Sequence, residues 1–189
     1  MKQLPSLEHH FLIAMPSLNG SWFEKTVIYI LEDNNDHGTT GFVVNLPQKF
    51  QVRDLLSHFN YPPPENAPFL KQAILQGGPV DVEQGFILHK PEGQWKSSVA
   101  LPDGLTMTFS DDFVEALSKN NAAEAFLICL GFSGWKPGQL AQEIQSNSWL
   151  TIPYNERLLF NTPAEDKWHV ALETLGISPE FLTFEAGHA

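Results

Sequence analysis

The residues from Phe126 to Leu140 constrain the fold of this chain more than any other stretch. Five consecutive apolar residues, 126–130, predict a strand that is covered on both faces and lies at the centre of a sheet. Glycines punctuate residues 131–135, which predicts a sharp turn, and Pro137 predicts the start of a helix. Strand–turn–helix junctions hold nucleophiles or anion-binding amides in many α/β proteins, so this junction is the first candidate site.

The composition predicts one folded domain spanning residues 1–189. Hydrophobic residues make up 42% of the chain and aromatic residues 12%, which is enough for a large core. The single cysteine, Cys129, falls inside the apolar strand, where we expect a packed and unreactive side chain and a reducing compartment. The apolar run Phe11–Met15 is too short for a signal peptide or a membrane span. We therefore expect a cytoplasmic protein without a membrane anchor.

The charge of the chain argues against nucleic acid as a partner. The formal net charge is −11, and the eleven basic residues form no run, because even Lys49 and Arg53, the two nearest, are separated in sequence. Phosphate neutralisation supplies most of the affinity for nucleic acid, so we expect no direct DNA binding. An acidic surface instead favours solubility or a basic protein partner.

Alternating and β-branched patterns predict strands, and 3.6-residue periodicity predicts helices, along the whole chain. The segments 26–31 and 41–46 predict a hairpin, residues 95–101 an edge strand, and residues 105–109 a half-exposed strand. Ser110 and the sequence 162–165 are typical helix starts, and Gly176 followed by Ile177 is a typical helix end. The remaining expected elements are strands at 11–15, 73–76, 85–89 and 149–152 and helices at 51–59 and 137–147.

The order of these elements predicts an α+β fold with a mixed sheet. Strands joined by turns occupy the front half of the chain. From residue 105 to residue 152, two strand–helix–strand units follow one another, and each predicts a right-handed parallel crossover. The sequence contains no internal repeat and no low-complexity segment.

Ser133 is the candidate nucleophile, but its surroundings fit the motif only in part. A nucleophile elbow needs a glycine two residues after the serine, and Trp135 stands there. Asp166, His169 and His188 follow in the order that a serine hydrolase uses. The alternative interpretation is that Ser133 is a turn residue that satisfies backbone groups.

No spacing in the chain matches a set of metal ligands, so we expect no metal and no cofactor. Residues 33–38 are similar to the start of a calcium loop, but His37 stands at the fifth position and Val44 at the position of the bidentate carboxylate. The seven histidines are scattered, and we interpret His89 as a residue at the edge of the core. Residues 77–79 predict a tight turn rather than an anion cradle, because no cation adjoins them.

Several segments in this order resemble one bacterial family. They include Gly77-Gly78-Pro79-Val80, residues 85–89, and the stretch Gly131–Leu140, which reads Gly-aromatic-x-Gly-Trp-x-x-Gly-Gln-Leu. The chain resembles the YqgE/AlgH family over nearly its whole length. The resemblance implies a single α+β domain whose mixed sheet is split and partly rolled into a barrel-like core, with helices packed outside. It also implies a largely uncharacterised family, sometimes labelled as transcriptional regulators, for which no catalytic residues are implied here.

These observations rank three functions from different classes. The first is a non-enzymatic cytoplasmic regulatory or adaptor module that acts through contacts with an unknown protein partner. The second is a protein that binds a small anionic metabolite at the 131–139 turn, and the third is a serine hydrolase that uses Ser133. The candidate ligand-binding residues are Gly131, Ser133, Gly134, Trp135, Gly138 and Gln139.

Overall fold

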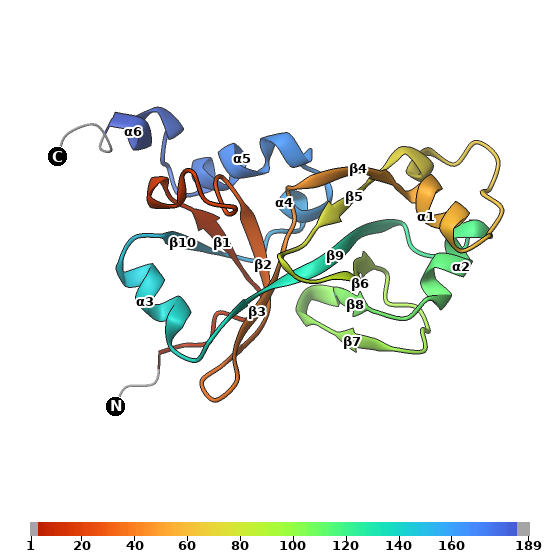
Figure 1. Ribbon diagram of the computed structural model, residues 1–189, viewed down its shortest axis with the longest axis horizontal. Helices are drawn as coiled ribbons and strands as arrows, with labels where there is room; N and C mark the ends of the chain where they lie inside the picture. Colours follow the sequence, from red (N-terminus) through yellow and green to blue (C-terminus); the bar gives the residue numbers. More distant parts are fainter. Residues whose placement is uncertain (1–3, 185–189) are drawn as a thin grey trace.

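The computed structural model describes residues 4–184, and within them ten strands form one curved sheet (Figure 1). The order of the main path is β10-β1-β2-β3-β9-β6-β8-β7, while β4 pairs with β5 and β5 pairs with β9. The strands are β1 (His10–Ala14), β2 (Val27–Asn34), β3 (Gly38–Val43), β4 (Pro47–Gln51), β5 (Ala73–Gln76), β6 (Val80–Lys90), β7 (Ser98–Ala100), β8 (Thr106–Thr108), β9 (Ala125–Trp135) and β10 (Trp149–Pro153).

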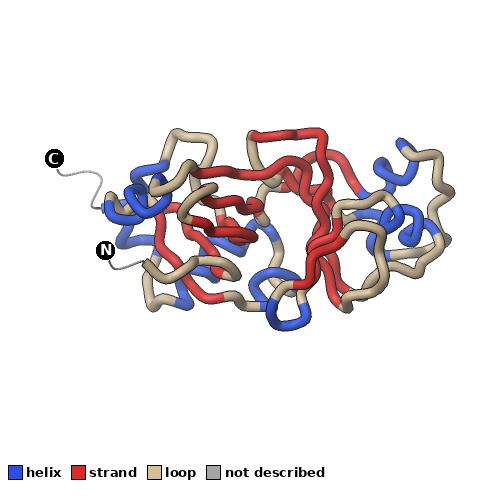
Figure 2. The backbone as a smooth tube through the Cα atoms, turned by 90° about the horizontal axis from the view of Figure 1, so that it is seen from below, coloured by secondary structure: helices blue, strands red, loops and turns tan. Residues whose placement is uncertain are grey.

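Helices lie at both ends of the long axis of the molecule, and further helical segments lie near its middle beside the strands (Figure 2). Helices α1 and α2 lie at one end, and α3, α5 and α6 lie toward the other (Figure 1). The helices are α1 (Val52–His58), α2 (Asp112–Ser118), α3 (Gln139–Gln145), α4 (Glu156–Phe160), α5 (Lys167–Thr174) and α6 (Pro179–Phe184). Short 3-10 turns cover Pro16–Leu18, Pro68–Lys71, Pro102–Gly104 and Ala164–Asp166.

Strand β9 is the central strand, as its apolar sequence predicted. It pairs antiparallel with β6 and β3 and parallel with β5. The turn that we predicted at residues 131–135 is wrong, because these residues continue β9, and residues 133–135 form its ladder with β3. Gly131 has a φ of +76°, so it bends the strand without ending it. The following helix begins at Gln139, after Gly138, and not at Pro137.

The backbone of β9 contacts the Gly77–Gly78 segment too closely to leave room for a side chain. A Cβ atom added at Gly78 would lie 2.0 Å from the carbonyl carbon of Phe132. The Gly77 N–H donates to the Leu130 carbonyl at 2.8 Å, and the Gly77 carbonyl accepts from the Val43 N–H at 2.8 Å. Gly77 thereby links β9 to the end of β3, directly after β5.

The topology confirms the predicted hairpin and the mixed sheet. Strands β2 and β3 pair antiparallel, and the parallel pair β5–β9 makes the sheet mixed. Each of the two strand–helix–strand units joins strands of the same direction, but the strands are not neighbours. Strand β6 lies between β8 and β9, and β3, β2 and β1 lie between β9 and β10. The handedness of these crossovers stays a prediction.

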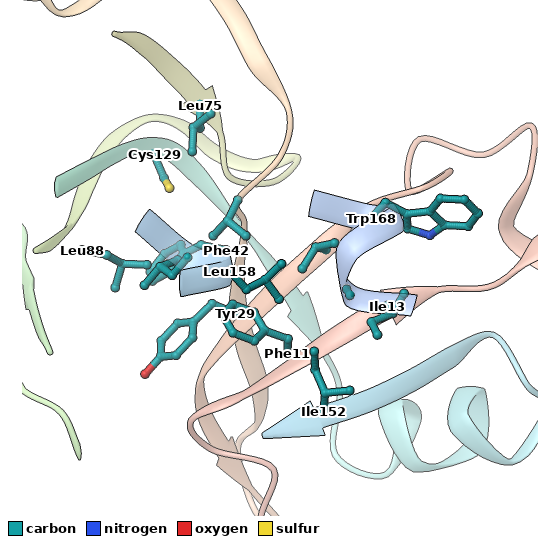
Figure 3. Close-up of a cluster of buried hydrophobic side chains, with 14 of the residues drawn as sticks. Phe11, Ile13, Tyr29, Phe42, Leu75, Leu88, Cys129, Ile152, Leu158 and Trp168 are labelled. Carbon is teal, nitrogen blue, oxygen red and sulfur yellow. The ribbon is translucent and has the colours of Figure 1, made fainter. Parts of the chain in front are cut away.

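Alternation along the strands divides the core between the two faces of the sheet. Phe11, Ile13 and Tyr29 pack against α4 and α5, whereas Leu12 and Ile28 pack on the opposite face with residues of α3. Figure 3 shows the first of these clusters, with Cys129 and Leu158 among its members. A third cluster lies between α1, α2 and β9. The sheet curls into a half-barrel with helices outside it, which confirms the predicted α+β fold class.

Local details of several expected elements differ from the structure. The residues of β8 are all buried, because Met107 packs in the first core cluster and the Thr108 hydroxyl bonds to buried His89, so the half-exposed strand was wrong. Ser110 donates to the Asp112 carboxylate instead of capping α2. The Thr162 hydroxyl donates to the Arg157 carbonyl, so no capping box forms there. The helix end at Gly176 is confirmed.

The close approach of residue 78 to β9 leads to a stability prediction. Gly78→Ala should lower the free energy of unfolding by about 3 kcal/mol, because the new methyl group forces backbone apart from backbone. Gly85→Ala is the matched control, since its Cβ would meet only the Leu130 side chain at 4.0 Å, and it should change stability by about 0.5 kcal/mol or less. Urea unfolding of both variants measures the difference, and equal stabilities would contradict the account.

Candidate functional site

The candidate residues 131–139 do not form an open turn in the structure. Ser133 is 0% exposed, and its hydroxyl donates to the Gly77 carbonyl at 3.2 Å. Gly131 is held against the backbone of Gly78 and Val80. Only Gly134, Gly138 and Gln139 among the six candidates are exposed. The segment therefore holds strands together, and its serine faces the interior.

A carboxylate occupies the place where an anion was expected. The indole N–H groups of Trp135 and Trp149 both donate to Oε2 of Glu143, at 2.9 and 2.8 Å. The side-chain amide of Gln139 donates to Oε1 of the same residue at 2.9 Å. Because Glu143 on α3 already receives these donors and brings a negative charge, the geometry disfavours a second anion here.

The candidate partners of Ser133 also lie elsewhere. Asp166 belongs to the 3-10 turn before α5, and His169 is exposed on α5. His188 lies outside the described residues. A nucleophilic serine needs a base within hydrogen-bonding reach, and the hydrogen-bond partner that the structure gives Ser133 is a carbonyl. The arrangement describes a structural hydroxyl rather than a nucleophile.

Ser133→Ala should therefore lower the free energy of unfolding only slightly and should remove no nucleophile. The Gly77 carbonyl keeps its bond from the Val43 N–H, so the loss should be about 1 kcal/mol. A serine-directed fluorophosphonate should leave the wild-type protein unlabelled. Stoichiometric labelling that is lost in a folded Ser133→Ala variant would contradict this structural role.

Two histidines are held by hydrogen bonds inside the fold. His89 is fully buried, its Nδ1–H donates to the Pro91 carbonyl at 3.0 Å, and its Nε2 accepts from the Thr108 hydroxyl at 2.7 Å. Burial lowers the pKa of His89, which agrees with a neutral ring. His9 contacts the Tyr29 hydroxyl through Nδ1 at 2.8 Å and the Asp103 carboxylate through Nε2 at 2.9 Å. Within residues 4–184, no cluster of three His, Cys, Asp or Glu side chains is placed to hold a metal.

Cys129 and Lys167 are buried ionisable groups that act on each other electrostatically. Burial raises the pKa of the Cys129 thiol to about 12, and the nearby Lys167 opposes that shift. Burial lowers the pKa of Lys167 to about 8, and Cys129 opposes that shift in turn. Lys167 is 2% exposed, and its Nζ donates to the carbonyls of Leu158 and Leu159 at the end of α4.

The burial of the Cys129 thiol predicts slow reaction with thiol reagents, as did the position of Cys129 in the apolar strand. At pH 8 the folded protein should react with a disulfide reagent on the order of a thousandfold more slowly than the unfolded chain, because so little thiolate forms. Timed reaction with and without denaturant measures the ratio. Equal rates in the two conditions would contradict the burial of Cys129.

An apolar groove, which we name the α1–α2 groove, opens at one end of the molecule. Its volume is about 620 Å³, and it exposes three large apolar side chains: Phe59 is 41% exposed, Val82 52% and Phe109 45%. The residues that line it are Phe50, Leu55, His58, Phe59, Val82, Glu83, Gln84, Gly85, Ile87, Phe109, Ser110, Asp111, Val114, Ile128 and Leu130.

An incompletely paired strand runs along this groove. The edge of β6 that faces β8 is paired from Ile87 to His89, so residues 80–86 have no neighbouring strand on that side among the described residues. On the other side, the register with β9 shifts between Val80 and Gly85. Exposed strand edges of this kind can accept an extended peptide through backbone hydrogen bonds.

Sequence reasoning did not single out the residues of the groove. Phe59 was expected as the last residue of the helix at 51–59, but it follows the last turn of α1 and is exposed. Phe109 was expected inside a strand, but β8 ends before it. The available signal was Val82, because it stands between Asp81 and Glu83 in the sequence.

Comparison with known proteins places the chain in a family. A model of the AlgH-like family matches residues 11–180. A UPF0301 protein of Hydrogenovibrio crunogenus is 58% identical over 190 residues, with 100% of both chains covered. The solution structure of the AlgH protein from Pseudomonas aeruginosa is similar with a TM-score of 0.76 and 38% identity, and it covers 100% of each chain.

A crystal structure of a protein from Corynebacterium diphtheriae shows likeness in fold alone. It has a TM-score of 0.68 at 20% identity and covers 92% of this chain and 89% of its own. The fold, the motifs and these matches define one class of protein, and this chain belongs to the AlgH-like family. The family resemblance that the motifs indicated is thus confirmed. In residues 4–184, no helix combines the length and apolar character needed to cross a membrane.

Proposed function

We propose that this protein is a cytoplasmic regulatory or adaptor module, a single domain of residues 1–189, that binds a partner protein through the α1–α2 groove. The observation that carries the proposal is the gathering of Phe59, Val82 and Phe109 around one hollow. Contiguous exposed apolar surface rimmed by polar residues is typical of protein-binding sites. Buried Ser133 gives no comparable support to an enzyme.

The partner is a protein with an extended segment in which apolar residues are flanked by Lys or Arg. Glu83 and Asp111 bring carboxylates to the groove, and Asp81 and Glu83 line the adjoining hollow around residues 79–84. The formal net charge of −11 attracts basic partners over a longer range. The unpaired edge of β6 supports an extended conformation, because it offers backbone groups to an added strand.

Selection from phage-displayed random short peptides tests this proposal. The protein should enrich peptides with apolar residues beside Lys or Arg, and their binding should weaken as salt rises. Val82→Ser combined with Phe109→Ser should reduce the affinity at least about tenfold, which is about 1.4 kcal/mol for two lost apolar contacts, and it adds no charge to the groove. Leu175→Ser, at a 40% exposed leucine next to α5, is the matched control and should bind normally.

Three results would count against the groove. Peptides that bind the double variant as tightly as the wild type would place the binding surface elsewhere. Enrichment of acidic peptides would contradict the charge argument. Self-association that rises with protein concentration and is lost in the double variant would make a second copy of this chain the occupant.

A further inference from the structure

Lys167 is a buried cation for which the described part of the chain supplies no counter-ion. It is 2% exposed, yet none of the three ion pairs formed within residues 4–184 includes it. Buried charges in proteins are normally paired, because an isolated charge is costly away from water. The missing negative charge is the feature that needs an explanation.

The carbonyls at the end of α4 accept only two of the three hydrogen bonds that the Lys167 ammonium group can donate. Two of its N–H donors reach the carbonyls of Leu158 and Leu159, the first at 2.9 Å. Backbone carbonyls at a helix end attract a cation, but lysines in that role usually keep their charged end in water. An ammonium carries three donors, and the third has no acceptor among the described residues.

A cavity adjoins this side chain. Its volume is about 540 Å³, which lies in the range of small-molecule sites, and Lys167 is among the residues that line it. The lining is largely apolar, and it shares no residue with the α1–α2 groove. Representative lining residues come from the 3-10 turn Pro68–Lys71, β5, the start of β9 and α4, and they include Phe69, Leu75, Phe126, Leu127, Leu159 and Phe160.

We propose that this cavity binds a small monocarboxylic acid with an apolar body, whose carboxylate pairs with Nζ of Lys167. The carboxylate supplies the counter-ion and accepts the third N–H, and the apolar body packs on the aromatic and aliphatic lining. The single positive charge of Lys167 matches the single negative charge of a monocarboxylate. Glu124, an exposed residue of the same lining, disfavours a more highly charged anion such as a phosphate ester.

The charge of Lys167 makes binding depend on pH. The pKa of the free lysine is lowered to about 8 by burial, so a bound carboxylate should raise it by favouring the charged form. Affinity should be full below pH 8 and fall above it, reaching about a tenfold loss near pH 9. The ionisable group that acts on Lys167 electrostatically is the Cys129 thiol, with a pKa of about 12. The other ionisable groups on the elements around Lys167 are exposed, and they are Glu124, Glu156, Arg157, Glu165, Asp166 and His169.

Titration with octanoate, with 1-octanol as the neutral isostere, tests the proposal by calorimetry. Octanoate should bind the wild-type protein saturably and 1-octanol at least about tenfold more weakly, the scale of one charge-assisted hydrogen bond. Lys167→Met should lose octanoate binding. Lys119→Met, which removes the exposed lysine directly after α2, should keep it.

Nuclear magnetic resonance of the Lys167 side chain tests the same pairing in the unaltered protein, so the result does not depend on whether Lys167→Met folds. Octanoate should raise the pKa of Lys167, and 1-octanol should leave it unchanged. Absence of saturable octanoate binding, equal binding by a folded Lys167→Met, or an unmoved lysine pKa at saturating octanoate would each overturn the proposal. These outcomes are independent of peptide binding at the groove.

Discussion

The structure depends on the contact between the Gly77–Gly78 backbone and strand β9. No side chain fits at this contact, because a Cβ atom on Gly78 would lie 2.0 Å from the Phe132 backbone. The same segment bonds to β9 through Leu130 and Ser133 and to the end of β3 through Val43. Backbone N–H and C=O groups that are buried away from water need hydrogen-bond partners, and at this contact the backbone groups of the two segments bond to each other. The contact therefore joins the segment after β5 to both β9 and the end of β3.

Both proposed sites are lined by residues of the strand that this contact holds. Ile128 and Leu130 of β9 line the α1–α2 groove, and Ala125 and Leu127, nearer its start, line the Lys167 cavity. A continuous strand with partners on both sides is a rigid support. The exposed aromatic residues and the edge of β6 stay accessible at the groove, because the buried residues of α1 and α2 pack in a separate cluster with β9.

Sequence reasoning succeeded where the signal was local and failed where it came from a distant contact. The apolar run 126–130, the β2–β3 hairpin and the end of α5 at Gly176 followed from periodicity and turn chemistry. Gly131 was interpreted as part of a turn, although a strand also needs glycine where another backbone approaches it closely, as Gly78 and Val80 approach Gly131. Lys167 carries no local mark of burial, because its partners on α4 come together with it only in the fold.

Hydrogen exchange of the β9 amides tests the central claim most directly. If residues 127–135 form one strand within the sheet, their paired amides should be among the slowest to exchange and should share one opening free energy close to that of global unfolding. Fast exchange of residues 131–135, with protection confined to 126–130, would mean that the chain turns after Leu130. That result would contradict the continuous strand on which this account of the fold and of both sites depends.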